Sequence, residues 1–164
     1  MYRVCFVCTG NICRSPMAEA VLRAHVREAG LDGLVEVDSA GTGSWHLGDP
    51  EDPRTAAVLA ASGYPLTHLA RRFEPDWFDT HDLVVALDEG HAAELRALAR
   101  NSAEAGKVRL LRSYDPEADP GELSVPDPYY GGERGFTVCL EMVEAAVPGL
   151  LSEVGAALDA REAG

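Results

Sequence analysis

Residues 4–16 read VCFVCTGNICRSP, and this stretch decides how the rest of the chain is arranged. Its first residues are mostly β-branched or aromatic, which is typical of a buried parallel strand. At its other end, Ser15 as N-cap and Pro16 in the first helical position predict a helix that continues to Gly30. A loop between a strand and a helix directs backbone N–H groups and the positive helix end toward one point, where a phosphate can bind.

Three side chains of this stretch supply the chemistry that attack on a phosphate ester requires. Cys8 follows the strand, and a helix N-terminus with a nearby Arg favours its thiolate, so we predict that it is the nucleophile. Arg14, at the spacing C-x5-R, can bind two phosphate oxygens through its planar guanidinium and stabilise the charge of an in-line transition state. Ser15 can donate its hydroxyl to the Cys8 sulfur, which makes that sulfur a better leaving group.

The remaining residues of the loop shape its backbone. Gly10 allows the chain to turn with no Cβ in the way, and Asn11 tolerates a left-handed backbone while its amide braces the loop. Thr9, Ile12 and Cys13 complete the loop. We therefore predict that residues 9–13 surround and support the bound phosphate.

The C-x5-R spacing is weak evidence by itself, but three longer strings are more specific. They are CTGNICRSPMAEA at 8–20, SAGT at 39–42 and DPYYG at 127–131. Together they closely resemble the low-molecular-weight protein tyrosine phosphatase family, in family order and over nearly the whole chain. The resemblance implies hydrolysis of phosphotyrosine through a phosphocysteine intermediate, without a cofactor or a metal. It also implies phosphotyrosine-containing proteins as partners, with a tyrosine kinase as one candidate.

A phenolate leaving group needs a proton donor, and such a general acid must lie on a loop above the pocket. Asp127 is fixed between two prolines in the sequence VPDP at 125–128, which limits its freedom to move. It also matches the general acid of the family. We therefore predict that Asp127 protonates the leaving tyrosine and then acts as the base for the attacking water.

The resemblance assigns supporting roles to two further residues. Ser39, in the SAGT string, would join a hydrogen-bond network that holds the phosphate loop, and His68 would brace the loop asparagine. Two plainer interpretations remain open: a capped turn in the loop that contains Ser39, and an ordinary surface histidine at position 68.

Aromatic residues are expected around the mouth of the pocket. By the resemblance, Trp45 would form one wall and stack on the substrate ring. Tyr129 and Tyr130 would line the entrance on the opposite side, with Ile12 between them on the loop. Aromatic walls on a deep pocket favour a phosphotyrosine ring over the shorter phosphoserine side chain.

The four cysteines have different expected environments. Cys5 and Cys8 form a C-x-x-C pair, but residues three apart on a strand point to opposite faces, so we expect Cys5 in the core. Cys139 is also expected in the core, by helical spacing. The resemblance implies that Cys13 can form a reversible disulfide with Cys8 that protects it from over-oxidation. We expect no cluster of metal ligands.

Apolar segments after residue 30 alternate with helical patterns. This alternation predicts an α/β fold in a single domain, 1–164, with a doubly wound, four-stranded parallel sheet and helices on both faces. The further strands are expected near 34–37, 83–87 and 107–111, and the further helices at 52–63, after Asp88 and at 136–159. Asp52 and Asp88 are expected to cap the helices that they precede. Pro148 should kink the last helix or split it in two.

Composition restricts the class of partner. The chain has 164 residues, 46% of them hydrophobic, which suits one core, and its net charge of -13 argues against nucleic-acid binding. No signal peptide or membrane span is evident, and four irregularly spaced cysteines suggest a reducing compartment. We therefore expect a cytoplasmic monomer that does not bind membranes.

Two other functions fit the same loop. An arsenate reductase on this scaffold would relay electrons through a mobile pair of further cysteines, and the middle of this sequence has no such pair. A silent phosphotyrosine-binding module would retain Arg14 and the glycines but could lose Cys8 or Asp127, and both are present. Phosphotyrosine hydrolysis is therefore the preferred interpretation.

Overall fold

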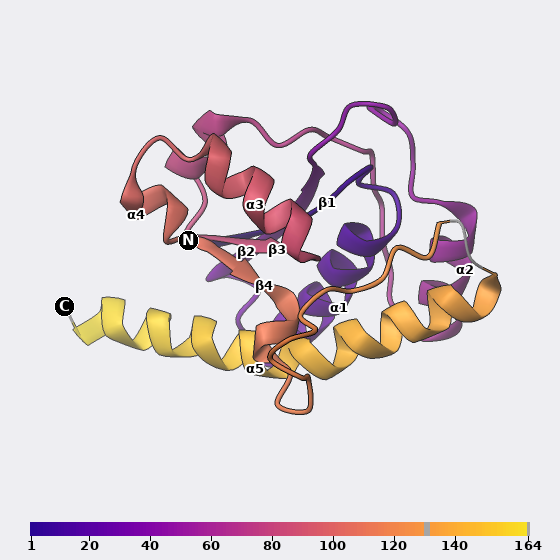
Figure 1. Cartoon of the computed structure of the whole chain (residues 1–164). Helices are drawn as coiled ribbons and strands as arrows, with labels where there is room; N and C mark the ends of the chain where they lie inside the picture. The colour runs from indigo at the N-terminus through magenta and orange to yellow at the C-terminus, as the bar shows by residue number, and fades with distance from the viewer. Residues whose placement is uncertain (130–131, 164) are drawn as a thin grey trace.

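The computed structural model describes residues 1–129 and 132–163, and its centre is one parallel sheet (Figure 1). Four strands pair in the order β2-β1-β3-β4, and every pairing is parallel. Their bounds are Tyr2–Cys8 for β1, Val35–Gly41 for β2, Leu83–Ala86 for β3 and Val108–Leu110 for β4. The predicted four-stranded, doubly wound α/β fold is confirmed.

Helices cover both faces of the sheet (Figure 1). On one face lie α1 (Arg14–Glu28) and α5 (Glu133–Ala163), with α2 (Pro53–Ala61) packed against them. On the other lie α3 (Glu89–Leu98), with the short α4 (Ser102–Ala105) beside it, and the 3-10 turn η1 (Pro75–Asp79). A second 3-10 turn, η2 (Leu111–Tyr114), follows β4 and contacts α5.

The side chains of β1 alternate between these two layers. Val4, Phe6 and Cys8 belong to the apolar cluster beneath α1 and α5, whereas Cys5 and Val7 belong to the cluster beneath α3. This is the alternation expected of a strand that is buried on both faces. The prediction that Cys5 and Cys8 point to opposite faces is therefore confirmed.

Two predictions about local structure around the first loop are wrong. Helix α1 starts at Arg14 with Cys13 as its N-cap, so Ser15 is not the cap; its hydroxyl is instead directed at the Cys8 sulfur. Strand β2 continues through Ser39 to Gly41, where a loop was expected, because these small residues keep pairing with β1. The other expected caps are present: Asp52 accepts from Arg54 N, and Asp88 accepts from His91 N.

Helix α5 is continuous through Pro148, so the predicted split is wrong. Its axis changes direction between the orange half and the yellow half, which agrees with the predicted kink (Figure 1). Its inward residues recur at helical spacing on both sides of the proline and stay in one apolar cluster; they are Phe136, Cys139, Leu140, Val143, Ala146, Val147, Leu150 and Val154. Packing against that cluster keeps the two halves in one helix although the proline removes one backbone hydrogen bond.

By length and composition, α5 is the one helix among the described residues that could cross a membrane. Such a match is weak evidence, because a core helix of a globular fold has the same composition. Here the apolar face of α5 packs on α1, α2 and η2.

Two glycines of α5 allow a matched test of this packing. An added Cβ at Gly149 would lie 2.4 Å from the carbonyl oxygen of Tyr114 in η2, whereas one at Gly155 would meet no atom within 4 Å. We expect Gly149→Ala to lower the free energy of unfolding by about 1–3 kcal/mol. Gly155→Ala should raise it by about 0.5–1 kcal/mol, because alanine favours the helix. Urea denaturation of both variants checks this, and equal effects would contradict the packing of α5 on η2.

Candidate active site

The loop of residues 9–13 joins β1 to α1 at the carboxyl end of the sheet, where α/β folds place their sites. Its carbonyl groups are bound from outside the loop: Cys8 O by Thr42 N (2.9 Å), Thr9 O by Gly43 N (3.0 Å), Asn11 O by His68 Nε2 (2.6 Å) and Ile12 O by Asp52 N (2.8 Å). A loop whose carbonyls are held in this way turns its amides inward. The structure therefore forms an anion-binding concavity at the start of α1.

Cys8 lies at the floor of this concavity. Cys8 is 2% exposed, and its Sγ is 2.9 Å from Ser15 Oγ and 3.4 Å from the backbone N of Ser15. Asn11 Nδ2 donates to Ser15 Oγ at 2.9 Å, which leaves the hydroxyl proton of Ser15 free to point at the sulfur. The hydroxyl and the backbone N–H of Ser15 therefore both lie within hydrogen-bond distance of the Cys8 sulfur.

Asn11 connects the loop to the rest of the fold. Its backbone has φ 57°, a left-handed conformation that asparagine tolerates. Its Nδ2 also donates to Ser39 Oγ at 3.0 Å, and its Oδ1 accepts from Arg71 N at 2.8 Å. Ser39 in turn donates to the buried Glu19 carboxylate at 2.7 Å. The structure thus places both Ser39 and His68 against Asn11, at its side chain and its carbonyl respectively.

Arg14 is held on one side and faces the pocket with the other. It is 3% exposed, and its Nη1 donates to Asp88 Oδ2 at 2.9 Å and to the carbonyl oxygen of Val125 at 2.8 Å. Its Nη2 lies 3.7 Å from Asp127 Oδ2. Because Nη1 is fixed by Asp88 and Val125, the guanidinium plane is set before any anion binds.

A histidine that the sequence did not single out lies next to Thr9. His91 Nε2 is 2.7 Å from Thr9 Oγ1, and His91 Nδ1 lies 3.1 Å from Asp88 Oδ1 without a hydrogen bond between them. Burial, opposed by Asp88 and assisted by the Arg14 charge, lowers the pKa of His91 to about 4. His91 is therefore neutral near pH 7, and Asp88 links it to Arg14.

The pocket above Cys8 has a volume of about 440 Å³. Its lining comes from the phosphate loop, the loop after β2 and the segment before α5: Cys8, Thr9, Gly10, Ile12, Cys13, Arg14, Trp45, His46, Asp127 and Tyr129. The predicted walls Ile12, Trp45 and Tyr129 are thus brought together with Cys8. Tyr130, predicted beside Tyr129, lies outside the described residues.

Trp45 is the most exposed of these walls. It is 77% exposed, and its indole lies over Gly43, where an added Cβ would be 2.1 Å from the ring. Across the pocket mouth, Arg54 stacks on the Tyr129 ring at 5.5 Å and donates to the Tyr129 carbonyl oxygen. The entrance therefore has an aromatic side chain on each side: Trp45, which lies over Gly43, and Tyr129, which contacts Arg54.

Sequence reasoning missed Asp88, His91, Val125, His46 and Arg54 as contributors to the site. Asp88 was recognised as a helix cap, and its Oδ1 has that role. The hydrogen bond that its Oδ2 accepts from Arg14 depends on the pairing of β3 with β1. Nothing in the local sequence of the other four indicates a contact with the loop, because each lies on an element remote from the loop in sequence.

Cys13 lines the same pocket as Cys8, and the four cysteines are free thiols. Burial and the Asp52 carboxylate raise the pKa of Cys13 to about 12, so it is a thiol at neutral pH. The reversible Cys8–Cys13 disulfide stays a prediction. Cys139 is buried on the inward face of α5, as predicted, and burial raises its pKa to about 12.

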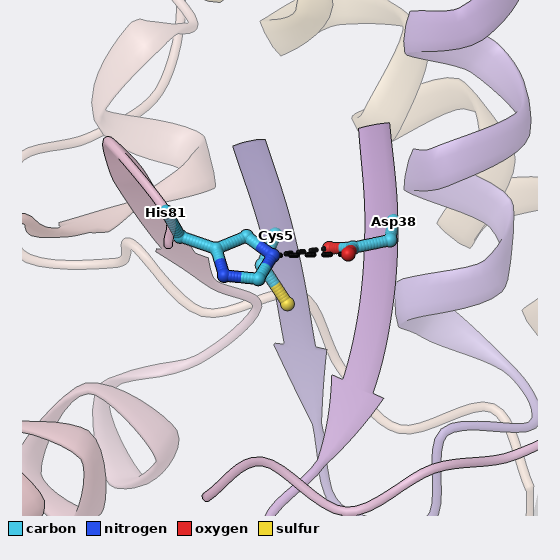
Figure 2. Close-up of side chains that lie close together, drawn as sticks. All are labelled: Cys5, Asp38 and His81. Atoms are coloured by element: carbon cyan, nitrogen blue, oxygen red, sulfur yellow. Dashed lines mark hydrogen bonds and ion pairs between the residues drawn. The ribbon is translucent and has the colours of Figure 1, made fainter. Parts of the chain in front are cut away.

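The expectation that no metal ligands would gather is wrong for the described part of the chain. Cys5, Asp38 and His81 each offer one ligand atom, and these atoms lie within 4.8 Å of one another (Figure 2). This cluster lies on the face of the sheet opposite Cys8. It does not belong to the pocket.

Fold and site together define an α/β protein with a thiol at the base of an anion-binding loop. The family model described as low molecular weight phosphotyrosine protein phosphatase matches residues 3–160. A Streptomyces coelicolor protein named low molecular weight protein-tyrosine-phosphatase is 65% identical over 162 residues, 99% of each chain. The chain therefore belongs to the low molecular weight phosphotyrosine protein phosphatase family.

Solved structures agree with this assignment. A protein tyrosine phosphatase from Entamoeba histolytica, with Hepes in its active site, has a TM-score of 0.90 and 32% identity, covering 96% of this chain and 99% of that one. A Drosophila arginine phosphatase has a TM-score of 0.85 and 32% identity, covering 92% and 96%. The fold thus supports phosphatases named for two different phosphorylated residues.

The bonds around Asn11 predict the effect of removing one hydroxyl. Ser39→Ala would leave the buried Glu19 oxygen without its donor and the Asn11 amide without an acceptor. We expect a loss of about 1–3 kcal/mol in unfolding free energy and weaker stabilisation of the fold by inorganic phosphate. Thermal denaturation with and without phosphate measures both. Ser152→Ala, on the exposed face of α5, is the control, and equal behaviour of the two variants would contradict the role of Ser39.

Proposed function

We propose that this chain hydrolyses phosphotyrosine in proteins by two successive displacements at phosphorus, through a phosphocysteine intermediate. One observation carries the proposal: the Cys8 sulfur lies within hydrogen-bond distance of the hydroxyl and the backbone N–H of Ser15 at the base of an anion-binding loop, with Arg14 beside it and Asp127 at the pocket rim. These are the nucleophile, the positive charge and the proton donor that a metal-independent phosphoryl transfer requires.

In the first step the Cys8 thiolate attacks phosphorus and the bond from phosphorus to the tyrosine oxygen breaks. The electron pair of that bond leaves with the oxygen, and Asp127 donates the proton that makes it a neutral phenol. Arg14 and the loop amides bind the three equatorial oxygens, where negative charge is spread in the transition state. The product is phosphocysteine, and Asp127 is now a carboxylate.

In the second step water attacks phosphorus and the bond from phosphorus to sulfur breaks. The Asp127 carboxylate takes a proton from the water, and the sulfur leaves as a thiolate with the electron pair. Ser15 eases this departure, because its hydroxyl lies 2.9 Å from the sulfur. Inorganic phosphate is released, and Cys8 and Asp127 return to their starting protonation states.

The walls of the pocket support phosphotyrosine as the substrate. Ile12, Trp45 and Tyr129 offer apolar and aromatic surfaces to a phenyl ring, while the nucleophile lies beneath them at the floor. A phosphoserine side chain is too short to place its phosphate on Cys8 while its backbone stays outside. Phosphoarginine is the second substrate to test, because a similar fold carries the Drosophila arginine phosphatase.

The alternatives weighed from the sequence find little support. An electron relay from Cys8 would need accessible cysteines beyond the loop, yet Cys139 is 1% exposed on the inward face of α5 and Cys5 lies on the other face of the sheet. A silent binding module has no need of Asp127, which here lines the same pocket as Cys8. Hydrolysis uses both residues.

We also propose a cytoplasmic monomer that acts on phosphotyrosine-containing proteins, including a tyrosine kinase. Four free, buried thiols suit a reducing compartment. The net charge of -13 is unfavourable for binding to nucleic acids or to acidic membrane surfaces. Large exposed apolar side chains are few in the described part of the chain, which argues against an obligate apolar interface.

The assigned roles predict how two variants behave. Phosphate release should be measured from phosphotyrosyl, phosphoseryl and phosphoarginyl peptides in the presence of a chelator. We expect turnover of the tyrosyl peptide, none by Cys8→Ser, and turnover slowed about 10²–10⁴-fold in Asp127→Asn. Cys139→Ser and Asp119→Asn are matched controls that should retain wild-type rates. Activity confined to the phosphoarginyl peptide would be consistent with the proposed mechanism but would contradict phosphotyrosine as the substrate.

The same roles predict a pH profile. Cys8 must be ionised and Asp127 protonated at once, so kcat/KM should be bell-shaped with a maximum on the acid side of neutrality. The acid limb follows protonation of the thiolate, and the alkaline limb follows ionisation of the carboxyl group. Asp127→Asn should lose the alkaline limb alone. A flat wild-type profile, or an alkaline limb retained in Asp127→Asn, would contradict the assignment.

A further inference from the structure

Three side chains with different donor atoms meet on the face of the sheet opposite the pocket (Figure 2). Cys5 on β1 and Asp38 on β2 are direct partners in the strand register, and His81 comes from the segment just before β3. The ligand atoms lie within 4.8 Å of one another. Cys5 and His81 are buried at 0% and 6% exposure, and the Asp38 side chain is 22% exposed.

The orientation of the His81 ring is fixed by its neighbours. Its Nδ1 is 2.9 Å from the carbonyl oxygen of Trp77, to which a protonated Nδ1 donates, and 3.1 Å from Thr80 Oγ1. The Trp77 ring also stacks on the imidazole, with centroids 5.5 Å apart and planes 13° apart. A histidine whose Nδ1–H is bound to a backbone carbonyl presents Nε2 as the free ligand atom, which is the usual arrangement in metal sites.

That nitrogen faces the Asp38 carboxylate. His81 Nε2 is 3.0 Å from Asp38 Oδ1 and 2.9 Å from Oδ2, and carboxylate oxygens carry only lone pairs. Either a proton or a metal ion has to lie between them.

The charge of the cluster is the same with protons as with a divalent metal ion. With protons, a neutral Cys5 thiol, the Asp38 carboxylate and the His81 imidazolium sum to zero. With a divalent ion, a thiolate, a carboxylate, a neutral imidazole and two positive charges also sum to zero. A metal ion can therefore replace two protons without leaving net charge in a buried site, which would be costly.

We propose that Cys5, Asp38 and His81 form a binding site for a divalent metal ion, with Zn²⁺ as the ion that suits the donors best. Sulfur, imidazole nitrogen and carboxylate oxygen are the three ligand types that zinc prefers. Bonds form to the metal from Cys5 Sγ, His81 Nε2 and Asp38 Oδ1, and the thiol proton and the Nε2 proton pass to solvent. The partly exposed side of Asp38 leaves room for water as a fourth ligand.

The surrounding groups suit this role. Arg71 Nη2 lies 3.7 Å from Asp38 Oδ2, so the carboxylate oxygen that does not bind the metal keeps a charged partner. Lys107 Nζ donates to the carbonyl oxygen of His81 at 3.0 Å and holds the segment that carries the ring. Ligating carboxylates and histidines ordinarily have such outer partners, and these orient the ligands.

The metal site is separate from the phosphatase pocket, and a bound ion would affect the stability of the fold. A bound ion would join β1, β2 and the segment before β3, in place of the direct contact between His81 and Asp38. The phosphatase loop uses the opposite face of β1, so metal binding here should raise thermal stability and leave phosphate release unchanged.

Cobalt binding tests the site, because Co²⁺ occupies zinc sites and its bond to a thiolate absorbs in the near ultraviolet. The titration should use Cys8→Ser, which removes one of the two thiols that line the pocket. We expect one Co²⁺ per chain with a thiolate band, and displacement of the band by Zn²⁺. In weakly buffered solution near pH 6, zinc binding should release two protons per ion.

Variants in the same background assign the ligands. Cys5→Ala should lose the thiolate band, while Cys139→Ala, which removes another buried thiol, should keep it. Asp38→Asn preserves the size of the side chain, so its folding is the least at risk, and it should weaken zinc binding by at least about 100-fold. His81→Gln should do the same, with His25→Gln as its control.

Three results would overturn the proposal. One is the absence of a thiolate band in Cys8→Ser at one equivalent of Co²⁺. Another is a band that survives in Cys5→Ala. The third is a zinc affinity that Asp38→Asn and His81→Gln leave unchanged, with circular dichroism showing that both variants are folded.

Discussion

The phosphate loop depends on one asparagine in a left-handed backbone conformation. At φ 57° Asn11 turns the chain so that loop carbonyls face outward, where Thr42, Gly43, His68 and Asp52 bind them. This conformation costs about 1 kcal/mol, and the three side-chain hydrogen bonds of Asn11, each worth about 0.5–1.5 kcal/mol, offset that cost. The same bonds direct the Ser15 hydroxyl at the Cys8 sulfur. Loop shape and nucleophile activation therefore have a common origin.

A second constraint concerns Arg14, whose positive charge an anion meets when it enters the pocket. The chain as a whole carries a net charge of -13, so the pocket has to attract an anion through a local field. Arg14 supplies this field from a buried position, and Asp88 and the Val125 carbonyl hold the half of the guanidinium that faces away from the pocket. Because Asp88 also neighbours His91, which contacts Thr9, one carboxylate connects both ends of the loop to α3.

The sequence predicted those parts of the site that lie within one stretch of chain. Cys8, Arg14 and Ser15 are close in sequence, and the turn from strand to helix is short, so their meeting could be inferred from the order of the residues alone. The N-cap role assigned to Ser15 was wrong. The preference of serine for N-cap positions does not tell whether its hydroxyl will bind a backbone N–H of the helix or a neighbouring sulfur. Ser39 was expected in a loop because small residues resemble a turn, yet they allow β2 to lie close to the phosphate loop.

Contacts between distant segments could not be predicted. Asp88 meets Arg14 only because β3 pairs with β1, and Cys5 meets Asp38 only through the register of β1 with β2. His81 joins them from a third segment, and no spacing motif connects the three residues. The four-stranded fold itself followed from apolar runs and helix signals, because these are local properties.

The central claim is that phosphate is transferred first to the Cys8 sulfur and only then to water. Mixing enzyme with excess phosphotyrosyl peptide, quenching within the first turnover and digesting the protein would locate the phosphoryl group by mass spectrometry. We expect one phosphoryl group on the sulfur of Cys8, formed as tyrosine is released and lost as phosphate appears. Release of phosphate without any phosphorylated protein, or a phosphoryl group on a residue other than Cys8, would contradict this order of transfer.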